Sequence, residues 1–148
     1  MTLTDEVRSF NRFYTREIGL LNRRLPATDL SLPEARVLYE LAQAPEGGLT
    51  AAEIGRTLRM DKAHLSRIMA RFRARGLALS RVSPDHRKHR LLSLSEAGRK
   101  AFAGADAAAR AQVDALLEPI DVGHRKRIVE AMRHIRATLS DREADDRK

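Results

Sequence analysis

Two short helical patterns followed at once by a basic hairpin pattern constrain the fold of this chain most strongly. The helical patterns lie between Arg56 and Arg75 and are broken at Met60–Asp61. Residues 77–82 and 90–94 then have the composition of two short β-strands, joined by the polar, basic loop S-P-D-H-R-K-H. A helix-turn-helix directly before such a hairpin predicts a winged helix. In that fold the second helix enters the major groove of duplex DNA, and the hairpin tip reaches the backbone and the adjacent minor groove.

Capping residues mark where the helices of this region begin and end. Thr50 and Glu53 form the capping-box pattern T-A-A-E at the start of a helix, and Asp61 is placed to cap the next one. Gly76 is expected to end the helix that Asp61 caps, at the position just beyond its C-cap. Ser95, directly after the second strand, is expected to cap a long alanine-rich helix.

The chain as a whole is predicted to be mainly α-helical with one small β-hairpin. Pro26 and Pro119 are expected to stop the first and fifth helices. Ser31 is expected to cap the second helix, with Pro33 tolerated in its first turn. The expected order is a helix over Thr4–Leu25, a helix from Ser31, a strand of one or two residues at Leu49, a helix from Thr50, a helix over about 62–75, the hairpin, a helix from Ser95 to about Leu117, a helix after Asp121, and a frayed charged tail after Leu139.

Apolar residues at helical spacing predict which faces of these helices are buried. The stripe on the first helix is wide, which indicates that this helix is covered from more than one side. The predicted apolar positions are Val7, Phe10, Tyr14, Ile18, Leu21 and Leu25, widened by Phe13 and Leu20, on the first helix; Ala35, Leu38, Leu41 and Ala42 on the second; Ile54 and Leu58 on the third; Leu65, Ile68, Met69 and Phe72 on the fourth; and Ile128, Ala131, Met132, Ile135 and Leu139 on the last.

The positive charge of the chain is concentrated in one segment. The whole chain of 148 residues has a net charge of +8, and residues 56–90 hold eleven basic residues against two acidic ones, a net charge of +9. The remaining residues carry 17 basic and 18 acidic side chains, a net charge of −1. A merely basic surface is the alternative, but solvated surfaces usually mix their signs. This localisation therefore favours a polyanionic partner.

Composition also excludes several classes of protein and of site. The chain has no cysteine, which excludes disulfides, thiolate metal sites and thiol-based redox sensing. The N-terminal segment M-T-L-T-D-E-V-R-S-F lacks the apolar region of a signal peptide, and no run approaches the ~20 apolar residues of a membrane span. We therefore expect a cytoplasmic protein with a single compact domain or a small domain with helical attachments.

The wing region carries the signature D-x-R followed by L-[TS]-x-x-G, met by Asp85, Arg87, Leu94, Ser95 and Gly98. With this signature and this order of elements, the chain resembles the MarR family of bacterial transcription regulators along essentially its whole length. The resemblance implies a homodimer in which each subunit offers one winged helix to a pseudo-palindromic operator, and it implies a ligand-responsive repressor. The organisation it implies is an N-terminal dimerisation helix over residues 1–30, a winged helix-turn-helix lobe over 31–96, C-terminal dimerisation helices over 97–140, and a charged tail over 141–148.

A second, weaker resemblance points to an alternative. Residues Val7–Gly19 and Leu32–Leu41 are similar to the N-terminal half of MarR-type proteins fused to a GNAT acetyltransferase. In that alternative the chain is a DNA-binding regulatory half, and acetyltransferase activity resides in a domain that we expect to be absent from it.

In the predicted wing, Arg87 is the first candidate for DNA contact. A guanidinium at the tip of a narrow hairpin fits the minor groove, where a narrow groove concentrates negative potential. In the resembled family, Asp85 holds this guanidinium by a charge-assisted pair. The alternative is a solvated salt bridge of little consequence. Lys88, His89 and Arg90 are expected to contact the DNA backbone without selecting bases.

On the predicted recognition helix, Ser66 and Arg67 are the candidates for base contacts. Lys62, His64 and Arg71 flank them on the same side. Arg67 has the geometry for a bidentate contact to guanine, worth ~1–3 kcal/mol of discrimination. The alternative is that Arg67 pairs only with a phosphate.

Phe10, Phe13 and Tyr14, together with Arg36, are candidates to line a small pocket between the dimer helices and the DNA-binding lobe. MarR relatives commonly bind small aromatic acids at such a place, and binding lowers their DNA affinity. The alternative is that these aromatic residues are plain core. A ligand acts as an inducer only if it prefers the state of the dimer that does not bind DNA.

No feature of the sequence indicates an enzyme, a cofactor or a metal site. A glycine-rich phosphate loop, paired carboxylates and a nucleophile–base set are all missing. His86 and His89 form the pattern H-x-x-H, but no acidic cluster or cysteine completes a metal site beside them. His124 and His134 do not share a helix face, so they cannot bind one metal ion together.

An architectural or RNA-binding module is a further alternative function. Of the six aromatic residues, Phe72 alone lies within the basic segment, and it belongs to the expected core. Single-stranded bases therefore have no aromatic platform on which to stack.

Overall fold

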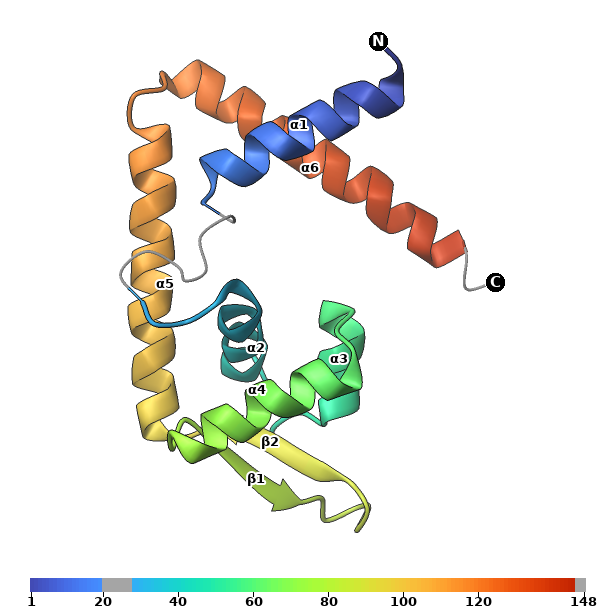
Figure 1. Cartoon of the computed structure of the whole chain (residues 1–148), viewed down its shortest axis with the longest axis vertical. Coiled ribbons are helices and arrows are strands. Elements are labelled where there is room, and N and C mark those ends of the chain that lie inside the picture. Colours follow the sequence, from blue (N-terminus) through green and yellow to red (C-terminus); the bar gives the residue numbers. More distant parts are fainter. Residues whose placement is uncertain (20–27, 146–148) are drawn as a thin grey trace. The chain divides into compact units, whose positions relative to one another are not determined.

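The computed structural model describes residues 1–19 and 28–145 of the chain. The chain divides into two compact units, Met1–Ala109 and Arg110–Lys148. The predicted fold class, mainly helical with one small hairpin, is confirmed (Figure 1). The elements of the described residues are α1 (Leu3–Glu17), α2 (Leu32–Ala42), α3 (Ala51–Leu58), α4 (Lys62–Ala74), β1 (Ala78–Val82), β2 (Arg90–Leu94), α5 (Glu96–Leu117) and α6 (Val122–Asp145).

The three helices of the winged lobe begin at the predicted capping residues. The chain turns between α3 and α4 at Arg59, whose φ of 50° lies in the left-handed region, and leaves α4 at Gly76, with φ 70°. In each helix the side-chain oxygen of the residue before the first turn accepts a backbone N–H from within that turn. These bonds join the Glu34 N–H to Ser31 Oγ at 3.3 Å, the Glu53 N–H to Thr50 Oγ1 at 3.2 Å, and the His64 N–H to Asp61 Oδ1 at 2.8 Å.

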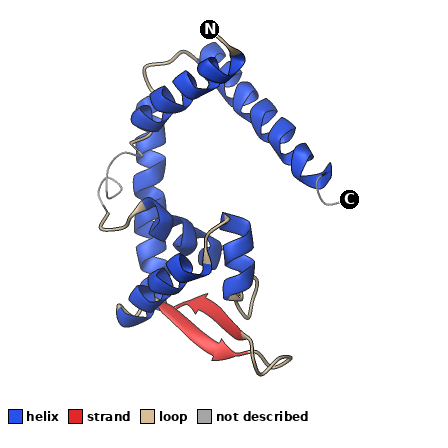
Figure 2. Cartoon of the chain, turned by 45° about the vertical axis from the view of Figure 1, so that its right-hand side comes forward, coloured by secondary structure: helices blue, strands red, loops and turns tan. Residues whose placement is uncertain are grey.

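β1 and β2 form a two-stranded antiparallel sheet, in a register that pairs Ala78 with Leu94 (Figure 2). Leu49 adds one bridge to β2, because its N–H donates to the Leu92 carbonyl at 2.9 Å and the Leu92 N–H donates back at 2.7 Å. The predicted short strand at Leu49 is therefore confirmed. Gly48, just before it, has φ +97°, and a Cβ there would lie 2.3 Å from the Leu92 carbonyl oxygen, so only glycine fits.

Leu77 lies outside β1, although the sequence predicted it as the first residue of that strand. Its N–H donates to the Phe72 carbonyl at 2.8 Å, and its own carbonyl accepts the Ser95 N–H at 3.0 Å. Ser95 Oγ accepts the Gly98 N–H at 3.0 Å and donates to the Gly76 carbonyl at 2.5 Å. The predicted cap at Ser95 thus fastens the start of α5 to the residues that follow α4.

The core of the winged lobe is built from one face each of α2, α3 and α4, closed by the hairpin. Ala101, Phe102 and Ala105 of α5 pack against this core. Val37 is fully buried, although the predicted stripe on α2 omitted it, because the buried face is centred on positions 34, 37, 38 and 41 rather than on the alanines. The buried apolar residues are Leu30, Val37, Leu38, Leu41, Ile54, Leu65, Ile68, Met69, Phe72, Leu77, Ala78, Leu92 and Leu94.

α1 is shorter than the predicted helix over Thr4–Leu25. It ends at Glu17, with Ile18 as its C-cap. Gly19 then adopts φ 72°, the left-handed conformation that terminates helices. The prediction is therefore wrong at the end of this helix, because a glycine outweighs the apolar spacing that continues past it. The predicted apolar residues Leu20, Leu21 and Leu25 and the predicted stop at Pro26 lie outside the described residues.

In the second unit, α6 begins where Asp121 was predicted to cap it. Asp121 Oδ1 accepts the His124 N–H at 3.1 Å. α6 continues through Asp145, so the prediction of a frayed tail directly after Leu139 is wrong; alanine, arginine and glutamate in this stretch are good helix formers. None of the helices in residues 1–19 and 28–145 has the length and apolar character that crossing a bilayer requires.

Candidate nucleic-acid interface

The outer face of α4 presents the residues that the sequence predicted to read bases. Lys62, Ser66 and Arg67 are exposed, and His64 is half-buried near the cap. The opposite face of α4 lies in the core, so this helix has one packed side and one polar, basic side. A helix anchored in this way can enter a major groove without losing its packing.

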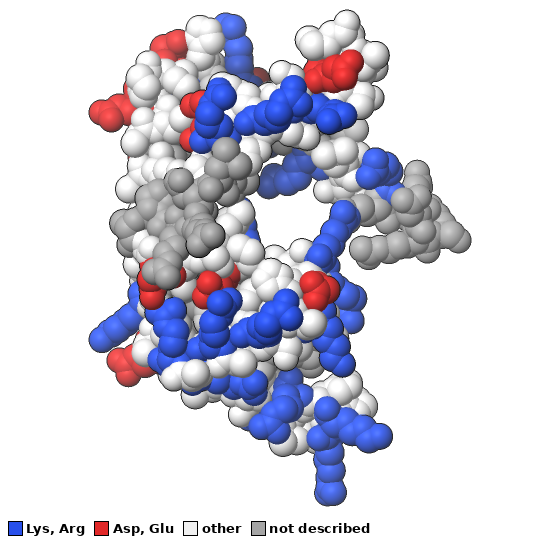
Figure 3. All heavy atoms as spheres, viewed as in Figure 1, with Lys and Arg blue, Asp and Glu red and all other residues white. Residues whose placement is uncertain are grey.

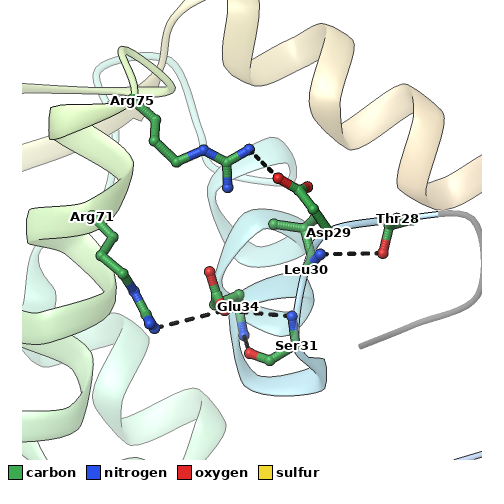
Figure 4. Close-up of polar contacts among 7 residues, drawn as sticks. All are labelled: Thr28, Asp29, Leu30, Ser31, Glu34, Arg71 and Arg75. Carbon is green, nitrogen blue, oxygen red and sulfur yellow. Dashed lines mark hydrogen bonds and ion pairs between the residues drawn. The ribbon is translucent and has the colours of Figure 1, made fainter. Parts of the chain in front are cut away.

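Two ion pairs connect α4 to the start of α2 (Figure 4). The guanidinium of Arg71 lies 3.6 Å from Glu34 Oε1, and that of Arg75 lies 2.7 Å from Asp29 Oδ2. Arg71, predicted as a flanking DNA contact, is therefore also engaged with a largely buried carboxylate. Sequence reasoning missed Glu34 and Asp29, because only the three-dimensional fold brings residues so far apart in the sequence together.

Backbone bonds close the loop of the wing between β1 and β2. The Ser83 N–H donates to the His89 carbonyl at 2.8 Å, and the His89 N–H donates to the His86 carbonyl at 3.0 Å. The Asp85 N–H donates to Ser83 Oγ at 3.3 Å, and the rings of His86 and His89 lie 5.1 Å apart. These bonds give the tip of the hairpin a defined turn that carries its basic side chains outward.

The basic residues of the wing are exposed, as their predicted role requires. Arg87 and Lys88 lie at the tip, and Arg90 lies at the start of β2, where its Nε donates to Ser80 Oγ at 2.9 Å. The ion pair expected between Asp85 and Arg87 is not formed within the described wing. The Arg87 side chain is exposed to solvent.

The positive side chains of the lobe gather on one part of the surface. Figure 3 shows Lys and Arg concentrated over the region that α4 and the hairpin occupy in Figure 1, with few acidic side chains among them. Arg81, which extends the basic set along β1, donates from Nη2 to the Gly47 carbonyl at 3.2 Å. The +9 segment found in the sequence therefore contributes its positive charge to this part of the surface.

The aromatic residues proposed for a ligand pocket form a cluster on α1. The rings of Phe10 and Tyr14 stack at 5.5 Å, and the rings of Phe10 and Phe13 lie 6.4 Å apart. Phe10 and Phe13 are each 49% exposed, and no residue of α1 is buried in the described chain, so these rings are not core of this single chain. Arg36 lies exposed on α2, and among the described residues the cation over this cluster is Arg16, which lies 5.9 Å from the Phe13 ring centroid.

The histidines do not gather with other ligating side chains in the described residues. No group of three or more His, Cys, Asp or Glu side chains there is arranged to hold a metal ion. His124 pairs instead with Asp121, its own helix cap.

Comparison with known proteins shows which family and which solved structures this chain resembles. Residues 28–89 match the model of the MarR family, and no curated protein matches the chain. The fold is similar to that of a probable transcriptional regulator from Pseudomonas aeruginosa, with 24% identity, a TM-score of 0.71, and coverage of 90% of this chain and 99% of that chain. It is also similar to MepR from S. aureus, solved as a DNA complex, with 13% identity, a TM-score of 0.72, and coverage of 93% and 98%.

A further similar structure is that of BpsR from Bordetella bronchiseptica, whose DNA binding is regulated by 6-hydroxynicotinic acid. It has 20% identity, a TM-score of 0.69, and coverage of 88% of this chain and 98% of that chain. The resemblance to MarR-type winged helices that the sequence predicted is confirmed by the family match and by these folds.

Proposed function

We propose that this chain, whose residues 28–89 match the MarR family, is a transcription regulator that binds a specific site in duplex DNA as a homodimer. The observation that carries the proposal is the coincidence of shape and charge. The exposed face of α4 and the tip of the hairpin, the two parts of a winged helix that meet DNA, both lie within residues 56–90, the segment that holds the excess positive charge of the whole chain.

The two parts of this surface have different roles in the proposal. Ser66 and Arg67 of α4 contact base edges in the major groove, flanked by Lys62, His64 and Arg71. In the wing, Arg87 enters the adjacent minor groove, where the absence of an ion pair with Asp85 leaves its guanidinium available.

The remaining wing residues add affinity rather than selectivity. Lys88, His89 and Arg90 are exposed around the hairpin tip and contact phosphates. The structure of MepR with DNA, which shares this fold, supports a duplex as the partner.

Exposed apolar residues on the terminal helices support the homodimer. Val7 on α1 is 59% exposed, and Met132, Ile135 and Leu139 on α6 are between 43% and 55% exposed. Contiguous apolar faces of this kind mark protein–protein interfaces. A symmetric pair built on these helices presents two copies of α4 to successive major grooves, about one DNA turn apart, and reads a pseudo-palindrome.

Repression relieved by a small aromatic or anionic effector is the regulatory part of the proposal. The stacked rings of Phe10 and Tyr14 on α1, with Phe13 beside them, offer a surface for an aromatic acid, and Arg36 offers a positive charge. Regulation of BpsR by 6-hydroxynicotinic acid supports an effector of this chemical class.

Selection of bound fragments from genomic DNA, followed by fluorescence anisotropy on the selected duplex, tests the function. Arg87→Ala is expected to weaken binding by about tenfold, the equivalent of ~1.4 kcal/mol, without loss of helical signal. Arg133→Ala, which removes the same charge from α6, is the matched control and should leave the affinity within about twofold. An unchanged affinity of Arg87→Ala would remove the wing from the interface, and a failure to enrich any duplex would remove the function.

Oligomeric state is tested by analytical ultracentrifugation. Ile135→Glu places a charge on the apolar face of α6 in each subunit and is expected to shift the protein from dimer to monomer. Ala137→Glu introduces the same residue on the opposite side of the helix and should leave the dimer intact. A wild-type protein that sediments as a monomer at all concentrations would refute the homodimer.

A further inference from the structure

Arg67 and Arg71 of α4 and Arg75 at its C-cap lie one turn apart along one side of the helix but have different surroundings. Arg67, Arg71 and Arg75 follow at intervals of four residues. Arg71 is paired with Glu34 at 3.6 Å and Arg75 with Asp29 at 2.7 Å. Among the ion pairs of the described residues, none includes Arg67.

The two carboxylates that pair with these arginines are not equivalent. The Asp29 side chain is 60% exposed, and an exposed pair of this kind is screened by water and contributes little. The Glu34 side chain is only 12% exposed, and its Oε1 also accepts the Ser31 N–H at 3.4 Å as part of the cap of α2. Glu34 is therefore held in place by its own helix and faces α4 with a charge that solvent screens weakly.

Arg71 spans the distance between this carboxylate and the surface (Figure 4). Its side chain is 57% exposed while its Nη2 faces Glu34, so Arg71 borders both the largely buried carboxylate and solvent. A guanidinium that is paired in this way loses fewer rotamers on binding than a free one, and the neighbouring carboxylate offsets part of its charge before DNA arrives.

We infer that Glu34 is a specificity-positioning residue of the interface. It orients Arg71 and suppresses the sequence-independent attraction of this arginine for phosphate, leaving Arg67 as the unpaired arginine of the row. The inference rests on the proposed function, because it assigns Glu34 a role within the same DNA-binding surface. Its consequence is that removal of the Glu34 charge raises affinity for any duplex and lowers the ratio between specific and random sequences.

Glu34→Gln tests this role with little disturbance of the fold. Glutamine has the size of glutamate and also serves in capping boxes, so the cap with Ser31 is preserved. The matched control is Glu53→Gln, because Glu53 occupies the same position in the capping box with Thr50, whose N–H it accepts at 2.8 Å. No ion pair joins Glu53 to an arginine within the described residues.

The measurement is the dependence of duplex binding on salt, with a fluorescent duplex of random sequence as the probe. For Glu34→Gln, the slope of log K against log salt is expected to be steeper than that of the wild type by about 0.9, because one more phosphate is neutralised. Glu53→Gln is expected to keep the wild-type slope.

A second measurement needs no variant. In the wild-type protein without DNA, NMR of the arginine side chains is expected to show slower guanidinium rotation for Arg71 than for Arg67. If Glu34→Gln and Glu53→Gln have equal slopes while the wild type binds duplex, or if the two arginines rotate equally fast, the inference is overturned and the proposed function stands. If the wild type binds no duplex, the proposed function falls and the inference falls with it.

Discussion

Substitution of Gly98 by alanine is predicted to destabilise the protein although alanine is the better helix former. Gly98 lies in the first turn of α5, and a Cβ there would be 2.0 Å from the Leu77 carbonyl oxygen, 3.0 Å from the Leu77 carbonyl carbon and 3.1 Å from Leu94 Cδ2. Real Cβ atoms essentially never approach another heavy atom to less than 3.0 Å, so the two backbones must separate by about 1 Å. That carbonyl also accepts the Ser95 N–H, and the shift weakens the bond that fastens α5 to the lobe.

The expected magnitude follows from three contributions. Overpacking against backbone costs about 1–3 kcal/mol. The weakened hydrogen bond costs up to ~1 kcal/mol. The higher helix propensity of alanine returns ~1 kcal/mol. The net loss in the free energy of unfolding is therefore ~2 kcal/mol, which lowers the Tm by about 4–8 °C for a chain of this size.

Gly104→Ala is the matched control, because it makes the same substitution in the middle of the same helix. A Cβ on Gly104 meets no atom within 4 Å. This variant is expected to gain about 0.5–1 kcal/mol from helix propensity alone. Thermal and urea unfolding followed by circular dichroism at one fixed protein concentration compares the two variants, since the stability of a dimer depends on concentration. Equal or higher stability of Gly98→Ala relative to Gly104→Ala would refute the close approach of α5 to Leu77.

Three further predictions concern stability. Phe72→Ala removes the largest fully buried side chain of the core and is expected to cost about 3–5 kcal/mol in urea unfolding, a loss that a loosely packed lobe would not show. Asp29→Asn breaks the exposed ion pair with Arg75 and is expected to change the free energy of unfolding by less than ~1 kcal/mol; a larger loss would mean that this pair is shielded from solvent. The backbone N–H and the ring of His124 lower the pKa of Asp121 from its ordinary value of 3.8. The stability that this carboxylate gives α6 is therefore fully present above pH 3.8 and is lost as the pH falls through the lowered pKa. Asp121→Asn is expected to remove this part of the acid sensitivity of the helical signal, and an identical acid titration of both proteins would contradict the assignment.

Local chemistry made the helix boundaries of the winged lobe predictable. Thr50, Asp61 and Ser95 are polar caps that satisfy backbone N–H groups, and Gly76 adopts a conformation that other residues avoid. Each of these signals depends on neighbours within three or four residues, which a sequence displays directly. The prediction for the end of α1 was wrong because it followed the apolar spacing, which continues beyond Gly19, and gave too little weight to this glycine as a helix terminator.

The candidate interface was predictable in its charge but not in its internal pairing. Periodicity correctly placed Ser66 and Arg67 on the exposed face of α4, opposite the buried apolar positions. No spacing rule connects Glu34 to Arg71, because these residues meet only after α2 and α4 pack together. The expected ion pair between Asp85 and Arg87 rested on their spacing and on the family resemblance, and it is not formed in the described wing, where the Asp85 N–H donates to Ser83 Oγ.

The central claim is that the basic surface of α4 and the wing faces double-stranded DNA. The dependence of duplex binding on salt tests this claim most directly. Binding of the selected duplex, measured by anisotropy between about 50 and 400 mM monovalent salt, is predicted to give a straight line of log K against log salt with a slope of about −0.9 for each phosphate contacted. The double variant Arg67→Ala/Arg87→Ala is predicted to make that slope shallower. A flat line for the wild type, or a slope that the double variant does not change, would contradict the claim.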